Sequence, residues 1–323
     1  MIVFRNGTGS IVAKNDDWTD MYVRVGKSGV IQARLSTPAM KSTFNTTPET
    51  ITATLGASYT VGGTASASTN LKLQHNGVQF ANVTGTSVSG SRTITAGNQK
   101  FKLIPNNDAT KADSFSFFIP AASTVAALPA GVRDGINYVS STSATLVLHA
   151  PGKNNVILLG DFNNWTPSLT YQMKKTADGQ KFWITLTGLT AGTEYAFQYL
   201  VDNTLRVADP YSEKVLDPWN DQYINDVAGY TVYPNLKAYP NGKTDGIVGV
   251  LQTAKPAYSW TVPNFAKPDQ NKLLVYELHL RDFVKEHCWK ALKDTLGYLE
   301  KLGINTIELM PFNEFDGNDS WGY

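Results

Sequence analysis

Two glutamates stand where paired carboxylates could do chemistry: Glu277 in the apolar run LLVYELHL and Glu308 in the run INTIELM. Two carboxyl groups about 5 to 5.5 Å apart can serve as nucleophile and acid/base in the cleavage of a glycosidic bond. Both glutamates, however, lie inside runs that predict buried strands, where a carboxylate must be paired. We therefore interpret them as structural. We interpret His279, in the first run, as a core or lining residue rather than a catalytic base.

Aromatic side chains are the other candidates, because an exposed ring can bind a flat, neutral ligand such as a sugar. The sequence has seven Trp and fifteen Tyr. Trp165 closes the motif GDFNNW and could be a binding platform or an interdomain packing residue; we favour packing. Trp183 alternates out of phase with its apolar neighbours, so it is a candidate for exposure, and hence for binding or domain contact. Trp219 in DPWN is expected to pack under the segment that follows.

The composition limits the classes of partner. The 323 residues contain 28 Lys and Arg against 27 Asp and Glu, so no basic footprint indicates a nucleic acid. The single cysteine, Cys288, excludes an internal disulfide framework and a cysteine-based zinc site, and we expect it to be a buried thiol. No stretch approaches the roughly 20 apolar residues of a membrane span. A monomer with a neutral partner is the expectation.

Most elements that must position these residues are predicted to be β-strands. Residues 1–35 contain two strand-like runs, too few to bury a face alone. Residues 36–124 show short alternating runs around Asn76-Gly77, a strong hairpin signal. A second all-β unit follows over 125–235, in which Tyr195, Phe197, Tyr199 and Val201 alternate along TEYAFQYLVDN and are expected to share one face of a strand. This spacing of short strands predicts tandem immunoglobulin-like β-sandwiches in a multidomain, mostly β chain.

After a Pro- and Gly-rich linker, expected over 236–271, the pattern changes class. LLVYELHL predicts a strand buried on both faces of a parallel sheet, and INTIELM predicts a second one. Between them, Gly303 stands where a glycine would end a helix. Residues 272–323 are therefore expected to begin with a β-α-β unit. The helix is predicted from apolar residues at spacings of three and four: Trp289, Leu292, Leu296, Leu299 and Leu302.

Three stretches together resemble one family. GDFNNW, followed by ADPYS and DPWN, resembles the β-sandwich known as carbohydrate-binding module 48, or E-set domain, which precedes the barrel in many starch-active enzymes. VYELHLRDF at 275–283 resembles barrel strand 1 of the α-amylase superfamily, glycoside hydrolase family 13. GINTIELMPFNEFDGNDSWGY at 303–323 resembles barrel strand 2 and the loop after it. Residues 1–35 look like the truncated end of a starch-binding-type module found ahead of such sandwiches in secreted bacterial amylases.

The resemblance implies that the chain is a fragment of a larger protein. A (β/α)₈ barrel takes about 250 residues, so residues 272–323 would be only the start of a truncated barrel. The family's catalytic carboxylates follow barrel strands 4, 5 and 7, and its calcium ligands come mostly from later parts of the barrel; neither set is expected in this chain. Tyr323 matches the family's tyrosine that stacks on the sugar at the subsite of bond cleavage.

For function, the resemblance implies a secreted or surface-attached bacterial α-amylase-type enzyme that cleaves α-1,4-glucans such as starch, glycogen or maltodextrin with retention. Pullulanases and glucan branching enzymes share this domain order and stay open as alternatives. A non-catalytic glycan-binding protein is a further alternative, against which the barrel-like stretches count. The 323-residue chain itself is expected to be inactive. Its candidate substrate-binding residues are Tyr323, Trp183 and Trp165.

Overall fold

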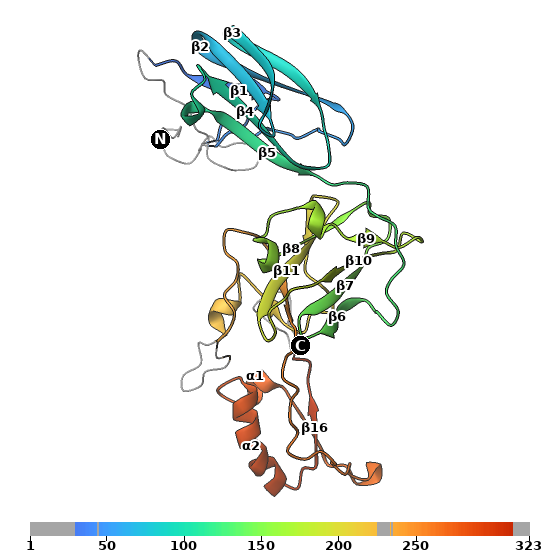
Figure 1. Cartoon of the computed structure of the whole chain (residues 1–323). Helices are drawn as coiled ribbons and strands as arrows, with labels where there is room; N and C mark the ends of the chain where they lie inside the picture. Colours follow the sequence, from blue (N-terminus) through green and yellow to red (C-terminus); the bar gives the residue numbers. More distant parts are fainter. Residues whose placement is uncertain (1–29, 44, 225–232, 234, 313–323) are drawn as a thin grey trace, which may run out of the picture.

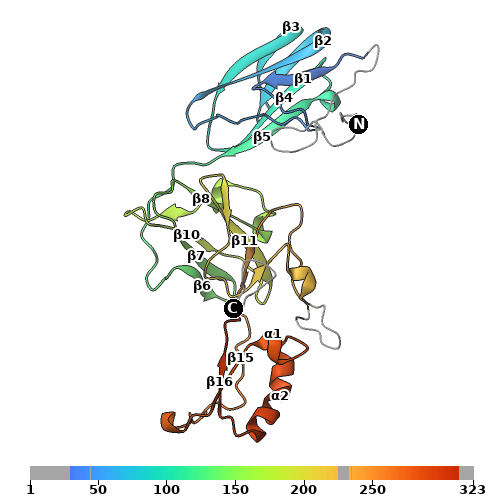
Figure 2. The same ribbon diagram turned by 180° about the vertical axis from the view of Figure 1, so that it is seen from behind.

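The computed structural model describes residues 30–312 except for residues 44, 225–232 and 234. Most of the secondary structure is β, as expected. Three parts follow one another along the chain: a β-sheet unit, a β-sandwich and a β-α-β unit (Figures 1 and 2). No helix in these ranges is both long and apolar enough for a membrane span. In the described part of the chain, five short 3₁₀ helices join the elements: η1 (Ala109–Lys111), η2 (Asp161–Asn163), η3 (Leu169–Tyr171), η4 (Asp221–Tyr223) and η5 (Gln270–Lys272).

The first part is one hydrogen-bonded sheet in the order β1-β2-β4-β5, with β3 on β2. The first half of β2 pairs with β1 and its second half with β4, so the expected two-sheet sandwich over 36–124 is a single sheet around a common core. The predicted hairpin is confirmed: Asn76 and Gly77 have φ values of 48° and 85°, as a two-residue type I′ turn requires. The strands are β1 (Ala33–Thr37), β2 (Ser58–His75), β3 (Val78–Thr93), β4 (Gly97–Pro105) and β5 (Asp113–Ile119).

The second part has two antiparallel sheets packed face to face. One sheet has the order β6-β7-β10-β9, with β6 (Gly135–Ser140), β7 (Ser143–His149), β9 (Lys174–Lys175) and β10 (Lys181–Leu186). The other has the order β12-β11-β14-β13, with β8 on β11. Its strands are β8 (Val156–Gly160), β11 (Glu194–Val201), β12 (Leu205–Val207), β13 (Val215–Leu216) and β14 (Val248–Gln252).

Strand β11 is buried on both faces. Phe197, Tyr199 and Val201 point into the core between the two sheets, which we call the inner core. Ala196 and Leu200, on the other face, belong to a second core that we call the outer core. The shared face predicted for alternate residues of this strand is therefore confirmed, but the opposite face is apolar and covered as well.

Part of the predicted linker is a strand of the sandwich. β14 lies within 236–271 and pairs with β11 from Glu194↔Gln252 to Phe197↔Gly249. Its Val248 is buried in the outer core. The expectation that the sandwich ends at residue 235 is wrong, because this five-residue strand between Pro- and Gly-rich segments joins β11 to β13 in the second sheet.

The third part is a β-α-β unit, with β15 (Val275–Leu278), α1 (Leu280–Phe283), α2 (Trp289–Lys301) and β16 (Thr306–Leu309). β15 and β16 pair in parallel, and Leu292 and Leu299 of α2 pack on Leu278. Helix α2 ends as predicted, since Gly303 adopts a φ of 85° and its N–H donates to the carbonyl of Glu300.

Two expectations for this unit are wrong. β15 is not buried on both faces: Val275 and Glu277 are exposed, because α1 and α2 pack against only one face of the two-stranded sheet and no described residue covers the other. Glu277 and Glu308 lie opposite each other in the parallel register, and both are exposed rather than tied into a buried wall. In the apolar stripe of α2, Trp289, Leu296 and Leu302 are exposed as well.

Candidate functional site

The motif GDFNNW forms a tight turn whose geometry is set by Asn163. Its Oδ1 accepts the backbone N–H groups of Gly160 (3.0 Å) and Trp165 (3.1 Å), and its Nδ2 donates to the carbonyl of Leu158 (2.8 Å). Asn164 and Trp165 have φ values of 50° and 60°. This left-handed turn directs the indole of Trp165 into the outer core, where it is buried.

Asp161 fixes that indole and joins the turn to the sheet. Its carboxylate accepts the Nε1–H of Trp165 (3.1 Å) and the N–H of Ala196 (2.9 Å), and it pairs with Nζ of Lys237 (3.0 Å). Burial acts to raise the pKa of Asp161, but these hydrogen bonds and the lysine outweigh burial and hold the pKa below its ordinary value. Trp165 thus packs rather than forming an exposed binding platform, but it does not make the interdomain contact favoured from the sequence. Its indole lies in the outer core of the sandwich, a cluster that also includes Phe118 of β5.

Trp183 is also buried, so the expectation that it is exposed is wrong. It faces away from the inner core, as its alternation predicted. The segment ahead of β6 crosses this outer face, however, because the N–H of Ala126 donates to the carbonyl of Lys175 (2.9 Å). The indole Nε1–H donates to the carbonyl of Ala126 (3.1 Å), and Nζ of Lys174 lies 4.5 Å from the ring centre.

The remaining sequence candidates do not converge on one place. Tyr323 lies outside the described residues. Trp219 is exposed, contrary to the expectation that it packs. His279 is largely buried, with Nδ1 3.1 Å from a carboxylate oxygen of Asp282. Cys288 is a buried free thiol at the N-terminus of α2, as predicted. The described ranges contain no group of three or more His, Cys, Asp or Glu that could hold a metal ion.

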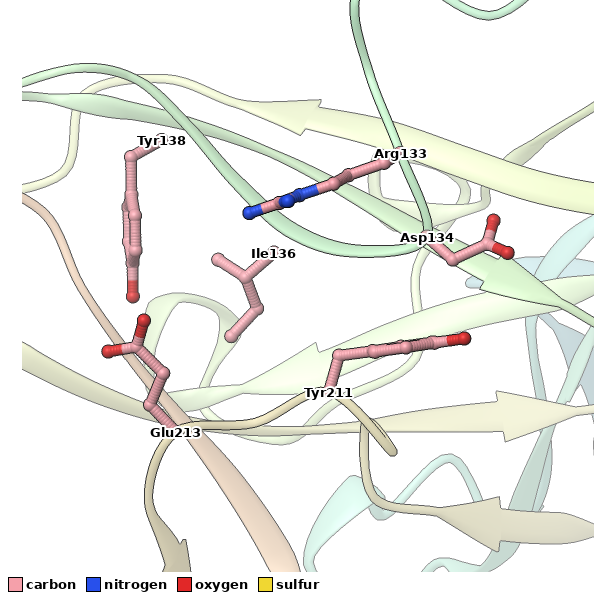
Figure 3. A pocket seen from close by; sticks show the side chains of 6 residues that line it. All are labelled: Arg133, Asp134, Ile136, Tyr138, Tyr211 and Glu213. Carbon is pink, nitrogen blue, oxygen red and sulfur yellow. The ribbon is translucent and has the colours of Figure 1, made fainter. Parts of the chain in front are cut away.

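A pocket of about 490 Å³ opens on the sandwich where β6 meets the segment before β13 (Figure 3). In Figure 3 the rings of Tyr138 and Tyr211 stand on two sides of Ile136, and the guanidinium of Arg133 reaches toward the side of Tyr138. The carboxylate of Asp134 points away, and it is paired with Lys181 at 2.6 Å. The six lining residues are Arg133, Asp134, Ile136, Tyr138, Tyr211 and Glu213.

Two local features place the tyrosines. The hydroxyl of Tyr138 accepts the backbone N–H of Gln252, at the end of β14 (3.2 Å). Tyr211 lies directly over Gly135, which has a φ of +87°; a Cβ on that residue would come within 2.5 Å of the Cβ of Tyr211. Glycine is therefore required at 135 both for its backbone conformation and for this close approach.

Asp209 links the backbone of Tyr211 to the inner core of the sandwich. One of its carboxylate oxygens accepts the N–H of Tyr211 (2.7 Å) and the other accepts the hydroxyl of Tyr199 (2.7 Å). Asp209 and Tyr199 are both buried. Burial raises the pKa of Asp209 above its ordinary value, and it raises the pKa of Tyr199 well above 10.

The rim of the pocket carries both signs of charge. Glu213 pairs with Lys255 at 3.1 Å, and both side chains are exposed. Within the described ranges no ion pair is recorded for Arg133. Aromatic faces, a guanidinium with several N–H donors and a carboxylate that accepts hydrogen bonds together suit a neutral ring with many hydroxyl groups. The pocket was not predicted from the sequence, although Tyr211 belongs to the quoted stretch ADPYS.

Comparison with known proteins agrees with this part of the fold. The model of the family carbohydrate-binding module 48 (isoamylase N-terminal domain) matches residues 135–219. A malto-oligosyltrehalose trehalohydrolase of Saccharolobus solfataricus is 28% identical over 153 residues, 47% of this chain and 22% of that protein. A 1,4-α-glucan branching enzyme of Clostridium perfringens is 25% identical over 183 residues, 54% of this chain and 24% of that protein.

Among solved structures, the type I pullulanase of Bacillus subtilis complexed with maltose is 18% identical, covers 91% of this chain and 39% of its own, and gives a TM-score of 0.40. The chain spans about a quarter of the length of the curated relatives named above. The matched residues contain β6 to β13 and four of the six pocket residues; the other two, Arg133 and Asp134, directly precede them. Residues 135–219 are therefore a carbohydrate-binding module 48 domain, of the kind that stands in the N-terminal region of glycoside hydrolase family 13 enzymes.

Proposed function

We propose that the sandwich binds α-glucan chains for a glycoside hydrolase family 13 enzyme that acts on α-1,4-glucans. The observation that carries this proposal is the match of carbohydrate-binding module 48 to residues 135–219, which contain every strand of the two-sheet sandwich except β14. The names of the relatives, a malto-oligosyltrehalose trehalohydrolase and a 1,4-α-glucan branching enzyme, support an α-glucan as the substrate class. The charge balance of the chain is compatible with such a neutral polymer.

The finer assignment is an α-amylase-type enzyme, secreted or attached to the cell surface, that cleaves α-1,4 bonds with retention. It rests on the resemblance of residues 275–283 and 303–323 to the first two barrel strands. A glucan branching enzyme is the second candidate, favoured by the branching enzymes among the relatives. In either case the parallel pair β15 and β16 would begin the barrel sheet.

Native electrophoresis of the 323-residue chain in gels with amylopectin tests the binding part. We expect amylopectin to retard the chain and hydroxyethylcellulose, a neutral β-linked polymer, to leave its mobility unchanged. A sandwich that recognises the shape of an α-linked chain distinguishes amylopectin from hydroxyethylcellulose, whereas a surface that binds polysaccharides non-specifically does not. Equal mobility in both gels would contradict α-glucan binding.

The same chain is expected to release no reducing ends from soluble starch. Its two aligned glutamates, Glu277 and Glu308, lie within β15 and β16, whereas barrel chemistry takes place at the C-terminal ends of the strands. The double variant Glu277→Gln/Glu308→Gln is the matched control. Activity that is present in the unmodified chain and lost in the double variant would mean that these carboxylates are catalytic.

A further inference from the structure

We propose that the pocket between Tyr138 and Tyr211 is an α-glucan subsite of the sandwich, and that Asp209 is a positioning residue that holds Tyr211 ready for the sugar. This inference rests on the proposed function, because it names the place where the α-glucan binds. It assigns sugar binding to Tyr138 and Tyr211, which were not predicted from the sequence as binding residues. They take the place of the predicted candidates Trp165 and Trp183.

Exposure decides between the two pairs of aromatic residues. A ring can stack on the C–H face of a sugar only if one of its faces is open to solvent. Trp165 and Trp183 are 4% and 7% exposed, and their Nε1–H groups are already donated within the protein. Tyr138 and Tyr211 are 43% and 59% exposed and line the same pocket. Only the tyrosine pair can therefore receive a ligand without unfolding part of the sandwich.

The polar groups of the pocket select the class of ligand. Arg133 offers N–H donors and Glu213 offers acceptor oxygens to a molecule between the rings. Lys255 already neutralises Glu213, and Arg133 adds one positive charge at the rim. These charges do not require an anionic ligand. The donors and acceptors together can form hydrogen bonds with the hydroxyl groups of a sugar, which both donate and accept them. Ile136 between the rings adds an apolar surface for the C–H groups of a glucosyl unit.

The site is built before the ligand arrives. Asp209 is buried and ties the backbone N–H of Tyr211 to the hydroxyl of Tyr199 in the inner core. Gly135 lets the side chain of Tyr211 approach the backbone of β6 closely. Less conformational entropy of the Tyr211 side chain is then lost when the ligand binds, and this preorganisation increases the affinity. The rim residue Tyr138 is held similarly, through the N–H of Gln252.

The first experiment measures the affinity of the 323-residue chain for maltoheptaose by calorimetry and for amylopectin by native electrophoresis. We expect Tyr138→Ala and Tyr211→Ala each to weaken binding about tenfold, which corresponds to about 1.4 kcal/mol. The matched control is Trp260→Ala, because Trp260 is 73% exposed but does not line the pocket; it should bind like the unmodified chain.

The outcomes separate the two proposals. If the unmodified chain binds and the double variant Tyr138→Ala/Tyr211→Ala binds equally well, the pocket is not the subsite although the proposed function stands. If Trp260→Ala loses binding while the tyrosine variants keep it, the site lies elsewhere on the chain. If the unmodified chain binds neither maltoheptaose nor amylopectin, the proposed function fails, and the subsite fails with it.

The second experiment tests Asp209. Asp209→Asn retains an oxygen that can accept the N–H of Tyr211, and its amide can donate to the hydroxyl of Tyr199, so binding should stay within about twofold of the unmodified chain. Asp209→Ala removes both partners and should weaken maltoheptaose binding about tenfold. Rescue by asparagine separates positioning from a direct role of the charge. Unchanged binding in folded Asp209→Ala would overturn the positioning role.

Gly135→Ala provides a second route if Asp209→Ala does not fold. The added methyl group would press on Tyr211 and displace it from the pocket without touching Asp209. We expect the same loss of maltoheptaose binding as in Tyr211→Ala, with circular dichroism verifying that the sandwich is intact. If the Gly135→Ala chain folds and binds maltoheptaose with full affinity, Tyr211 is not held in its binding position before the ligand binds.

Discussion

The sandwich and the β-α-β unit use similar short apolar strands, but they bury them to different extents. In the sandwich, β8 reads VILLG and all five residues are buried. In the β-α-β unit, β15 reads VYEL and only Leu278 is buried. The difference comes from what packs on each sheet: β8 and β11 have an apolar core on either side, whereas among the described residues β15 and β16 have α1 and α2 on one face and nothing on the other.

This comparison shows that an apolar run indicates a strand but not how many layers cover it. The inner core of the sandwich contains thirteen buried residues, and the cluster under α2 contains three. Each fully buried aliphatic or aromatic side chain contributes about 1.5 to 3 kcal/mol. We therefore expect the sandwich to be the more stable of the two regions, and substitutions in each can test this.

The largest expected effect is that of Trp165→Ala in the outer core. The indole is buried and donates to Asp161, so its removal leaves a cavity and an acceptor without its partner. We expect the free energy of unfolding to fall by about 3 to 5 kcal/mol. Urea unfolding followed by circular dichroism measures this. Trp219→Ala, at an exposed tryptophan, is the matched control and should change stability by less than about 0.5 kcal/mol. A loss below about 1 kcal/mol for Trp165→Ala would mean that the turn does not depend on the indole.

A smaller and more local effect is expected in the β-α-β unit. Leu299→Ala removes a buried side chain from the cluster under α2 and should cost about 2 kcal/mol, at the lower end of the usual range, because so small a cluster can collapse around the gap. Hydrogen exchange should become faster in residues 275–309 only. Limited proteolysis of the unmodified chain should likewise cut at residues 272–312 before 140–200.

The result that would remove the contrast between the two regions is cutting within 140–200 while the β-α-β unit stays intact. Leu296→Ala is the control for the helix, since Leu296 is exposed on the same element. It should leave hydrogen exchange in residues 275–309 unchanged.

Local signals in the sequence predicted a large part of this structure. Asn76-Gly77 predicted the hairpin, and Gly303 predicted the end of α2. Both features require residues with positive φ values, and these depend on the local sequence rather than on distant contacts. The period-2 pattern of β11 predicted its inner face. The motif GDFNNW indicated the sandwich, and its Asp and Asn side chains turn out to build the turn that buries Trp165.

The features that were missed depend on residues far apart in the sequence. Trp183 faces away from the inner core as predicted, but it is covered by Ala126, and no periodicity within β10 could reveal that contact. Tyr138 and Tyr211 line one pocket only because the segment after β12 returns to β6, where Tyr211 lies over Gly135. Neither tyrosine lies in a pattern that predicts a binding site by itself.

The smallest expected effect concerns the charge that anchors Trp165. Because the pKa of Asp161 is lowered in the folded state, its carboxylate stabilises the fold above its unfolded pKa of about 3.8, and this contribution is lost as the pH falls through the lower folded pKa. Asp161→Asn should cost about 1 kcal/mol at pH 7, and the gap to the unmodified chain should narrow below about pH 4. Urea unfolding at several pH values measures the gap. Asp245→Asn is the control, because Asp245 is 89% exposed and 3.6 Å from its partner Arg206, so it should show almost no loss at either pH. A gap that stays constant down to pH 3 would show that the hydrogen bonds of Asp161 matter and its charge does not.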